Sequence, residues 1–257
     1  MKLSIITVNL NNRDGLKRTI DSVVNQTFTD YEWIIIDGGS TDGSKELIEQ
    51  YAMHFAYWCS EPDKGVYSAM NKGIAHAKGE WLQFLNSGDW LYETKTLEYV
   101  FSNSHNAKII YGKMLRKDGT LNNQDMMKKN LYWSDFISGG LPHQSTFIKR
   151  ELFDQIGLYD ETLKAVSDWK FFVKAIVYNK IPYIYIPQII SIYEGDGISD
   201  IIGQKERTKE TTNLFPAMIL DDLYKIQTYD YLYSENFSKK ITDVLLKLIH
   251  WKKKRKK

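Results

Sequence analysis

Acidic and amide side chains follow several apolar, strand-like segments of this sequence, at the point where each segment ends. After WLQFL (81–85), for example, the chain turns through the short polar sequence NSGD before it becomes apolar again. A mainly parallel sheet binds ligands at the carboxyl ends of its strands, near a switch in strand order. The polar residues predicted to carry the binding chemistry are therefore those just past each strand: Asn9, Asp37, Glu61 to Asp63, and Asp89.

The stretch IIIDGGSTDGS (34–44) shows what such a strand end can do. The carboxylate of Asp37 can accept hydrogen bonds from a nucleobase N–H or from ribose hydroxyls. The two glycines that follow let a ligand approach the backbone, and the start of the next helix offers free N–H groups. The expected helix caps are Ser40, Thr41 or Asp42. A plain strand-to-helix connection with Asp37 as a cap is the alternative interpretation.

Strands that alternate with helices position these residues. Such alternation over the first 112 residues predicts right-handed βαβ units and a mainly parallel α/β sheet. From residue 113 the sequence is loop-rich, and shorter elements lead to a helix expected at 203–226. The first strands are expected at 3–8, 31–37, 55–60, 81–85 and 107–112, and the helices between them at 14–25, 40–52, 65–79 and 94–103.

The turn after the first strand, NLNNRDG, differs from two common nucleotide-binding loops. A dinucleotide-binding fold carries G-x-G-x-x-G at this place, whereas this turn has one glycine, and a Walker A loop is missing as well. Nucleotide recognition by this chain therefore needs another scheme.

Composition indicates a globular protein. The 257 residues suffice for one large α/β domain or two small ones, and aromatic residues reach 14%, which favours packing around polar ligands. The single cysteine, Cys59, excludes an intramolecular disulfide and fits a reducing compartment. No secretory signal and no run of about 18 apolar residues is recognised, so we expect a cytoplasmic location.

Basic charge is concentrated at the C-terminal end. The net charge is +2, and because the last six residues, KKKRKK, contribute +6, the preceding residues sum to −4. The segment ITDVLLKLIHW (241–251) has apolar residues at helical spacing, which predicts an amphipathic helix ending in a basic cluster. Such a helix favours an anionic membrane surface, hence a peripheral position at the inner face of the membrane; a docking helix with a solvated tail is the alternative. Nucleic-acid binding is not expected, because the basic charge is confined to the tail.

Two stretches resemble glycosyltransferase family 2, whose members have the GT-A fold. They are SIITVNLNNRDGLKRTIDSVVNQTFTDYEWIIIDGGSTDGS and SEPDKGVYSAMNKGIAHAKGEWLQFLNSGDWL, and the similarity extends through five motifs to about residue 200. The resemblance implies an inverting transfer of a sugar from a nucleoside diphosphate donor with the help of Mg²⁺ or Mn²⁺. It predicts a GT-A domain over residues 1–200, with a nucleotide-sugar-binding half (1–112) and an acceptor-facing half (113–200). A helical extension with the basic tail is expected over 201–257.

The resemblance also implies roles for individual residues. In the family, the strand here expected at 81–85 leads to an acidic cluster of D-x-D type, which holds the metal against the donor diphosphate. Asn86 and Gly88 stand where carboxylates often occur, so Asp89 is the predicted metal ligand. The amide of Asn86 is expected to face the ribose or a metal-bound water. The residues expected to bind the nucleotide are Thr7, Asn9, Asp37, Asp63, Asn71 and Asn86.

Inverting transfer needs a base that takes the proton of the acceptor hydroxyl. Asp168, in KAVSDWKFF at a predicted helix start, resembles the family's catalytic acidic residue and is the predicted base; a helix cap is the alternative. Asp160 is the rival acid, although it more closely resembles a structural turn of the family. His143 is expected to touch the diphosphate or line the acceptor site, and Trp169 to stack on a sugar face.

The leading hypothesis is a metal-dependent inverting glycosyltransferase that builds a surface polysaccharide or glycolipid. By the habit of the family the donor is a UDP-sugar, and the acceptor is a glycan or a lipid-linked molecule. A sugar nucleotidyltransferase is a weaker alternative, because NLNNRDG does not supply the glycine- and arginine-rich phosphate loop that it needs. A non-catalytic nucleotide-sugar-binding or scaffold protein stays open, because the acidic cluster is thinned.

Overall fold

The computed structural model describes residues 1–102, 106–122, 128–195 and 198–214. The chain divides into two compact units, Met1–Arg207 and Thr208–Lys257. Of the second unit only the helical residues 208–214 are described, so the predicted amphipathic helix and basic tail lie outside the described residues. The domain boundary predicted near residue 200 stays a prediction.

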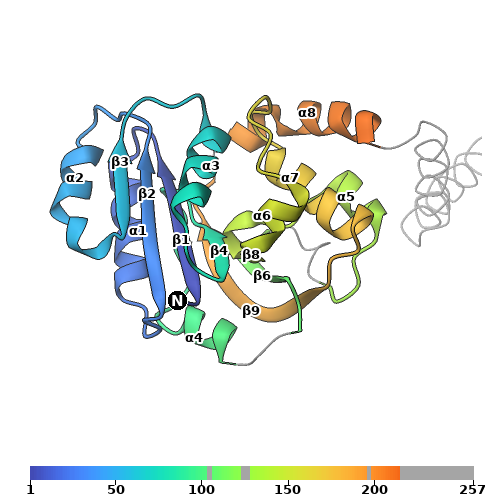
Figure 1. The fold of residues 1–257 in the computed structure, drawn as a ribbon, viewed down its shortest axis with the longest axis horizontal. Coiled ribbons are helices and arrows are strands. Elements are labelled where there is room, and N and C mark those ends of the chain that lie inside the picture. The colour runs from blue at the N-terminus through green and yellow to red at the C-terminus, as the bar shows by residue number, and fades with distance from the viewer. Residues whose placement is uncertain (103–105, 123–127, 196–197, 215–257) are drawn as a thin grey trace, which may run out of the picture. The chain divides into compact units, whose positions relative to one another are not determined.

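A nine-stranded mixed sheet forms the centre of the first unit (Figure 1). Its strands follow the order β3-β2-β1-β4-β8-β6-β9-β5, and β7 pairs with β6. The strands are β1 (Leu3–Asn9), β2 (Tyr31–Asp37), β3 (Tyr57–Ser60), β4 (Trp81–Phe84), β5 (Trp90–Leu91), β6 (Ile109–Arg116), β7 (Leu121–Asn122), β8 (Thr146–Lys149) and β9 (Tyr183–Tyr193).

Helices surround this sheet. The α-helices are α1 (Arg13–Val24), α2 (Ser44–Gln50), α3 (Val66–His76), α4 (Thr96–Phe101), α5 (Trp133–Ser138), α6 (Glu151–Ile156), α7 (Ser167–Phe172) and α8 (Ile198–Leu214). Short 3₁₀-helices span Ala52–His54 and His143–Ser145, and a π-helix, Val173–Tyr178, follows α7.

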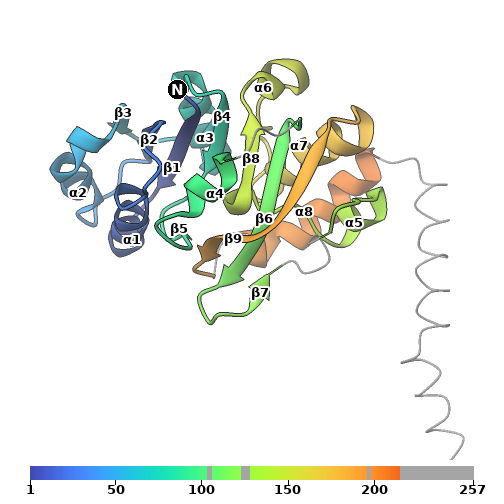
Figure 2. The ribbon, with the colours of Figure 1, turned by 90° about the horizontal axis from the view of Figure 1, so that it is seen from below.

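The first half of the sheet is parallel. β1 pairs in parallel with β2 and β4, and β2 pairs in parallel with β3. The expected α/β fold class is thereby confirmed. The second half adds antiparallel pairs, because β8 runs opposite to both β4 and β6. Figure 2 shows β8 beside β6, and this reversal brings the start of β8 to the same edge as the end of β4.

The buried strand β1 packs against helices on both faces. Side chains alternate across a strand, so Leu3 and Ile5 face one side, where they join the core cluster with Leu16 of α1. Ile6 faces the other side, towards α3. A Cβ at Gly73 of α3 would lie only 2.4 Å from Ile6 Cγ2, so the glycine permits this close packing.

The helix after β2 begins later than its sequence predicts. Its N-cap is Gly43, with φ +90° and no side-chain cap, instead of Ser40, Thr41 or Asp42. The reason is local hydrogen bonding: the Ser40 hydroxyl binds Asp37, and Asp42 Oδ1 accepts the N–H of Ser44 (3.0 Å) in a turn ahead of the helix.

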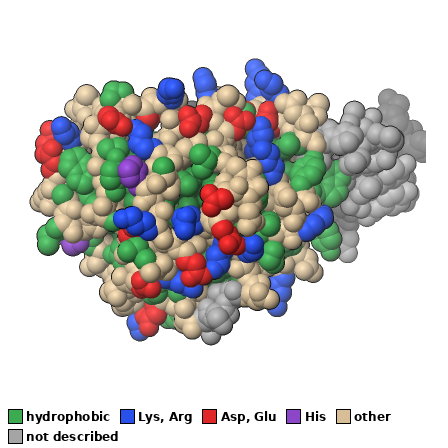
Figure 3. All heavy atoms as spheres, viewed as in Figure 1, with side chains coloured by type: hydrophobic (Ala, Val, Ile, Leu, Met, Phe, Trp, Pro, Cys, Tyr) green, Lys and Arg blue, Asp and Glu red, His purple; other side chains and the backbone are tan. Residues whose placement is uncertain are grey.

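Two surface properties bear on the predicted membrane contact. In the described part of the chain, no helix has both the length and the apolar character needed to span a bilayer. On the face that Figure 3 shows, Lys and Arg side chains are interspersed with Asp and Glu.

Candidate active site

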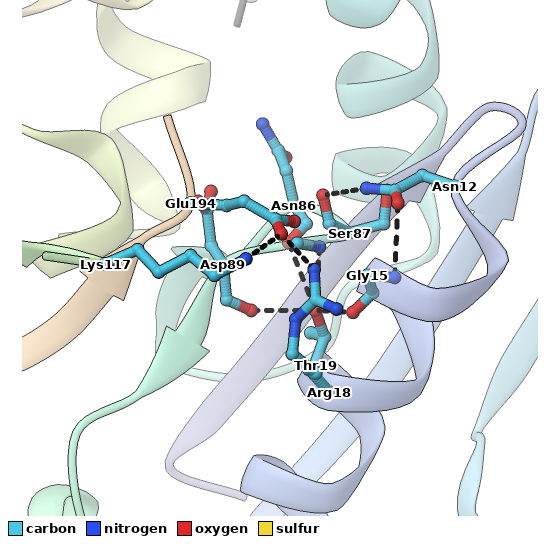
Figure 4. Close-up of polar contacts among 10 residues, drawn as sticks. Asn12, Gly15, Arg18, Thr19, Asn86, Ser87, Asp89, Lys117 and Glu194 are labelled. Carbon is cyan, nitrogen blue, oxygen red and sulfur yellow. Dashed lines mark hydrogen bonds and ion pairs between the residues drawn. The ribbon is translucent and has the colours of Figure 1, made fainter. Parts of the chain in front are cut away.

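The polar turn after β4 is held by side chains of α1 and its cap (Figure 4). The Gly88 N–H donates to Thr19 Oγ1 (3.1 Å), and the same hydroxyl donates to the backbone oxygen of Asp89 (2.7 Å). Asn12 Nδ2 donates to the backbone oxygen of Ser87 (3.1 Å). The turn therefore has a fixed backbone, which suits a preorganised site.

Glu194, just after β9, lies directly against this turn. Gly88 has φ +98°, and a Cβ there would lie 2.8 Å from Glu194 Oε2. The other carboxylate oxygen of Glu194, Oε1, forms ion pairs with Arg18 and with Lys117 Nζ (3.0 Å). Figure 4 shows both cations pointing to this carboxylate. Position 88 thus requires glycine for its backbone conformation and for the room that Glu194 takes.

Asp89 is buried, with 4% of its surface exposed. Burial raises the pKa of its carboxyl to about 7, although the charge of His143 and hydrogen bonds from Gln144 and the Glu194 N–H act in the opposite direction. The raised pKa means that these contacts do not offset the desolvation of the carboxylate, which favours the neutral form. Additional positive charge beside Asp89 would therefore stabilise its ionised form.

The turn residues fit a divalent cation that is bound together with a donor. Asn86 Oδ1 is a buried oxygen without a hydrogen-bond partner, and Asp89 is the neighbouring carboxylate. Among the described residues, no group of three or more His, Cys, Asp or Glu side chains could hold a metal by itself. Mg²⁺ typically takes one or two carboxylates and completes its shell with phosphates and water. The turn thus suits a cation whose other ligands come from a diphosphate.

A chain of polar contacts joins this turn to Asp168 of α7. Asn86 Nδ2 lies 3.3 Å from His143 Nε2, and His143 Nδ1 lies 2.8 Å from Asp168 Oδ2. The other oxygen of Asp168 accepts the hydroxyl of Tyr67 (2.8 Å). The antiparallel β8 is what brings His143 beside Asn86, although 57 residues separate them. Sequence-predicted residues from three motifs therefore meet in one place.

The ionisable groups of this chain perturb one another. Burial raises the pKa of Asp168, but the hydrogen bond and charge of His143 and the hydrogen bond of Tyr67 outweigh it, so the pKa is lowered. Burial lowers the pKa of His143, but the hydrogen bond and charge of Asp168 and the charge of Asp89 raise it above its ordinary value. Asp168 is accordingly ionised at neutral pH and accepts hydrogen bonds only.

Asn9 and Asp37 end the neighbouring strands β1 and β2, in register with each other. Asp37 is fully buried and accepts hydrogen bonds from Asn9 Nδ2 (2.7 Å), from the hydroxyl and N–H of Ser40, and from the Ser60 hydroxyl. Burial raises its pKa, but these bonds outweigh burial and lower it. Asp37 is therefore an ionised anchor for the loop after β2.

Asp63 lies beside this anchor. Its Oδ1 accepts the N–H of Gly65 (2.8 Å), and its Oδ2 lies 2.8 Å from the place where a Cβ at Gly38 would be. Gly38 follows Asp37 directly, so Asp63 and the end of β2 form one polar surface. The side chain of Leu10 is 59% exposed and lies next to the same glycine.

Three predicted ligand-binding residues have internal partners instead. Thr7 is fully buried and accepts the indole N–H of Trp33 (3.0 Å). Asn71 donates to the backbone oxygen of Tyr159 (2.9 Å) and accepts the N–H of the same residue (3.0 Å), which ties α3 to the Tyr159 turn. Trp169 is 3% exposed and donates to a backbone oxygen, so its ring is part of the core.

Several residues near the site were not predicted from the sequence. Tyr67 lies within the quoted GVYSAMNKG motif, and its helical spacing to the apolar Met70 and Ile74 is typical of a core residue. Arg18 lies within the other quoted stretch but was given no role, Glu194 lies in neither stretch, and the two meet across 176 positions of the chain. Only the order of the strands brings them together.

The mixed sheet, with polar residues at the ends of its parallel strands and a carboxylate turn after β4, has the GT-A fold of solved glycosyltransferase structures. The structure of TarS from S. aureus in complex with UDP-GlcNAc has a TM-score of 0.65 at 20% identity, covering 77% of this chain and 59% of that one. The mannosyltransferase PcManGT from Pyrobaculum calidifontis, in complex with GDP-Man and Mn²⁺, has a TM-score of 0.62 at 15% identity, covering 82% and 64%. At these identities the likeness shows the fold.

The sequence matches give the family. Residues 4–161 match the model of glycosyl transferase family 2, and the chain belongs to that family. A PGL/p-HBAD biosynthesis glycosyltransferase of Mycobacterium bovis is 31% identical over 220 residues, 80% of this chain and 82% of the relative. The putative teichuronic acid biosynthesis glycosyltransferase TuaG of Bacillus subtilis is 32% identical over 126 residues, 46% and 49% of the two chains. The predicted resemblance is thus confirmed, and it decides against a sugar nucleotidyltransferase.

Proposed function

We propose that this protein transfers a sugar, with inversion, from a UDP-sugar to a hydroxyl of a glycan or lipid-linked acceptor in surface polysaccharide or glycolipid synthesis. The relatives named above for PGL/p-HBAD biosynthesis and for teichuronic acid biosynthesis support the class of product. The UDP-GlcNAc complex of a protein with the same fold supports the class of donor.

The observation that carries the proposal is the contact chain from the turn after β4 to Asp168. Transfer with inversion needs a site for the leaving diphosphate on one side of the anomeric carbon and a proton acceptor on the other. Asn86 and Asp89 belong to the first group, and the pair of His143 and Asp168 to the second. The direct contact between Asn86 and His143 puts the two groups at one site, which suits groups that act on one substrate.

The nucleoside half of the donor fits the polar surface at the ends of β1 and β2. Asp63 has a partly exposed carboxylate that can accept ribose hydroxyls or a base N–H. Asp37 and Asn9 hold the backbone of this surface, and the exposed Leu10 offers an apolar contact to a planar base. The nucleotide roles of Asn9, Asp37 and Asp63 are thus proposed as parts of one surface.

Asp89 would hold a divalent metal, Mg²⁺ or Mn²⁺, with Asn86 facing the ribose or a metal-bound water. Such a cation supplies positive charge that neutralises the departing diphosphate. The Asp89 carboxyl is buried in a turn with a fixed backbone, so the turn would not need to reorganise to bind the cation. The mannosyltransferase with GDP-Man and Mn²⁺ is a protein of the same fold that binds such a metal.

The basic tail and the amphipathic segment before it would bring the enzyme to a lipid-linked acceptor at the inner membrane face. Six consecutive basic residues end the sequence, and each Lys or Arg near an anionic surface contributes about 1 kcal/mol. This anchor is proposed from the sequence pattern alone.

The test is a panel of nucleotide sugars incubated with the protein and Mg²⁺ or Mn²⁺, with release of nucleoside diphosphate as the readout. We expect turnover with a UDP-sugar and its loss in Asp89→Ala. The matched control is Asp154→Ala, which removes an exposed carboxylate of α6 and should leave the rate unchanged. Calorimetric titration with UDP, with and without Mn²⁺, accompanies the panel. Tight UDP binding without turnover of any donor would support a non-catalytic binding protein instead.

A further inference from the structure

The carboxylate of Asp168 is already enclosed by donors of its own chain. Its Oδ1 accepts the Tyr67 hydroxyl, and its Oδ2 faces His143 Nδ1, both at 2.8 Å. The N–H of Trp169 also donates to it, and its side chain is only 15% exposed. A base must reach the proton that it removes within about 2.6–3.2 Å. Both oxygens of Asp168 thus already accept from its own chain, and three of its roughly four lone-pair sites face these donors.

His143 has one ring nitrogen on each side of this arrangement. Because ionised Asp168 can only accept, His143 Nδ1 carries the proton of their 2.8 Å contact. In the neutral ring Nε2 is then an acceptor, and it faces Asn86 Nδ2 at 3.3 Å, a long contact. The His143 side chain is 17% exposed. The acceptor nitrogen of the pair thus lies at the turn where the donor is proposed to bind, and among the described residues its hydrogen-bond partner is Asn86, through this long contact.

We infer that His143 Nε2, and not the carboxylate of Asp168, takes the proton of the acceptor hydroxyl, while Asp168 positions the ring and balances its charge. The inference rests on the proposed glycosyl transfer and assigns the separate roles of His143 and Asp168 in removing the proton. The acceptor oxygen forms a bond to the anomeric carbon with its lone pair. The bond from that carbon to the diphosphate oxygen breaks, and its electron pair leaves with the nucleoside diphosphate. The hydroxyl proton moves to Nε2, which gives an imidazolium beside Asp168.

The surroundings suit both protonation states of the ring. Asn86 Nδ2 donates to the neutral ring, and its Oδ1 is a buried acceptor without a partner. The charges that act on the pair are Asp89, which acts on His143, and Arg207, which acts on Asp168. Asp89 favours the cationic ring, and Arg207 favours the ionised carboxylate.

The experiment separates removal of a proton from every other role. The probe is the UDP-sugar that the wild type turns over in the nucleotide-sugar panel, with water or sodium azide as the nucleophile. Azide carries no proton, so its attack needs no base. The variants are His143→Ala and His143→Asn, whose amide can keep the contact to Asp168, with Asp168→Asn and Asp168→Glu for the positioning role. His54→Ala, at an exposed histidine, is the matched control.

In both His143 variants we expect UDP release with water to fall by about 10²–10⁴-fold, the usual contribution of a general base. Transfer to azide should stay within about tenfold of wild type, and added imidazole should restore hydrolysis in His143→Ala. Asp168→Asn should lower kcat with little change in the KM of the donor, and Asp168→Glu should recover part of the rate.

Two results would overturn the inference. Loss of azide transfer together with hydrolysis would make His143 a structural residue. Hydrolysis within about tenfold of wild type in both His143 variants, with a complete loss in Asp168→Asn, would make Asp168 the base. A wild type without turnover of any nucleotide sugar would instead refute the proposed function, and with it the step assigned here.

Discussion

Replacing Asp89 by Asn should make the ligand-free protein more stable and inactive. The carboxyl is 4% exposed, and its pKa is raised from 3.8 to about 7, a shift of about three units. Each unit corresponds to 1.36 kcal/mol, so the buried carboxylate costs on the order of 4 kcal/mol once it is ionised. Because folding raises the pKa of Asp89, the contribution of this carboxyl to the stability of the wild-type protein is greatest below pH 3.8, where it is protonated in both the folded and the unfolded state. Its contribution to the free energy of unfolding then falls as the pH rises from 3.8 through 7. Asparagine has no such charge.

The assay is urea unfolding between pH 4 and pH 8.5, with EDTA and without nucleotide. The stability gain of Asp89→Asn should be near zero at pH 4, grow to about pH 7 and stay constant above it. Metal-dependent UDP binding should be lost in the same variant. The matched control is Asp37→Asn, at the end of β2, where hydrogen bonds lower the pKa of the carboxylate. That variant should be less stable than wild type by about 1–3 kcal/mol at neutral pH. The reasoning would be refuted if Asp89→Asn and wild type had the same free energy of unfolding at pH 8, or if the gain in stability did not depend on pH.

Three further changes test other parts of the structure. Gly88→Ala should lower stability by about 1–3 kcal/mol and weaken UDP binding, since a Cβ there meets Glu194 at 2.8 Å on a backbone with φ +98°; unchanged urea midpoint and affinity would contradict this. Asn71→Ala removes both contacts to the Tyr159 backbone and should cost about 1–3 kcal/mol, measured by thermal unfolding, whereas Ser68→Ala nearby should cost less. Deletion of residues 252–257 should move the protein from vesicles with anionic lipid to the supernatant in a sedimentation assay, and equal sedimentation of both forms would argue against the anchor.

The first half of the fold could be predicted because it consists of local patterns. The runs at 3–8, 31–37 and 81–85 are buried strands, and each matches its observed element within about two residues. The position of β8 between β4 and β6 could not be predicted from such local patterns. Strand order depends on pairing between distant segments, which leaves no local pattern in the sequence.

The candidate site shows the same division. Asp89, His143 and Asp168 stand out because their motifs mark them, but their connection through the imidazole depends on the antiparallel strand. Thr7 and Asn71 show that a polar residue type does not reveal where its side chain points. Both are buried and use their polar atoms on partners within the protein, as buried polar groups generally must.

The contact of Glu194 with Gly88 links two positions that are far apart in the chain. The resemblance to the family implies that a carboxylate often occurs at the place of Gly88, and this protein brings the carboxylate of Glu194 to the same space from just after β9. Both groups cannot occupy that volume, so the two positions should vary together among relatives. A homologue with Asp at the position of Gly88 should have a side chain smaller than Glu at the position of Glu194. An acid introduced at position 88 alone should therefore disrupt this turn, whereas an acid at 88 combined with a smaller residue at 194 should be accommodated.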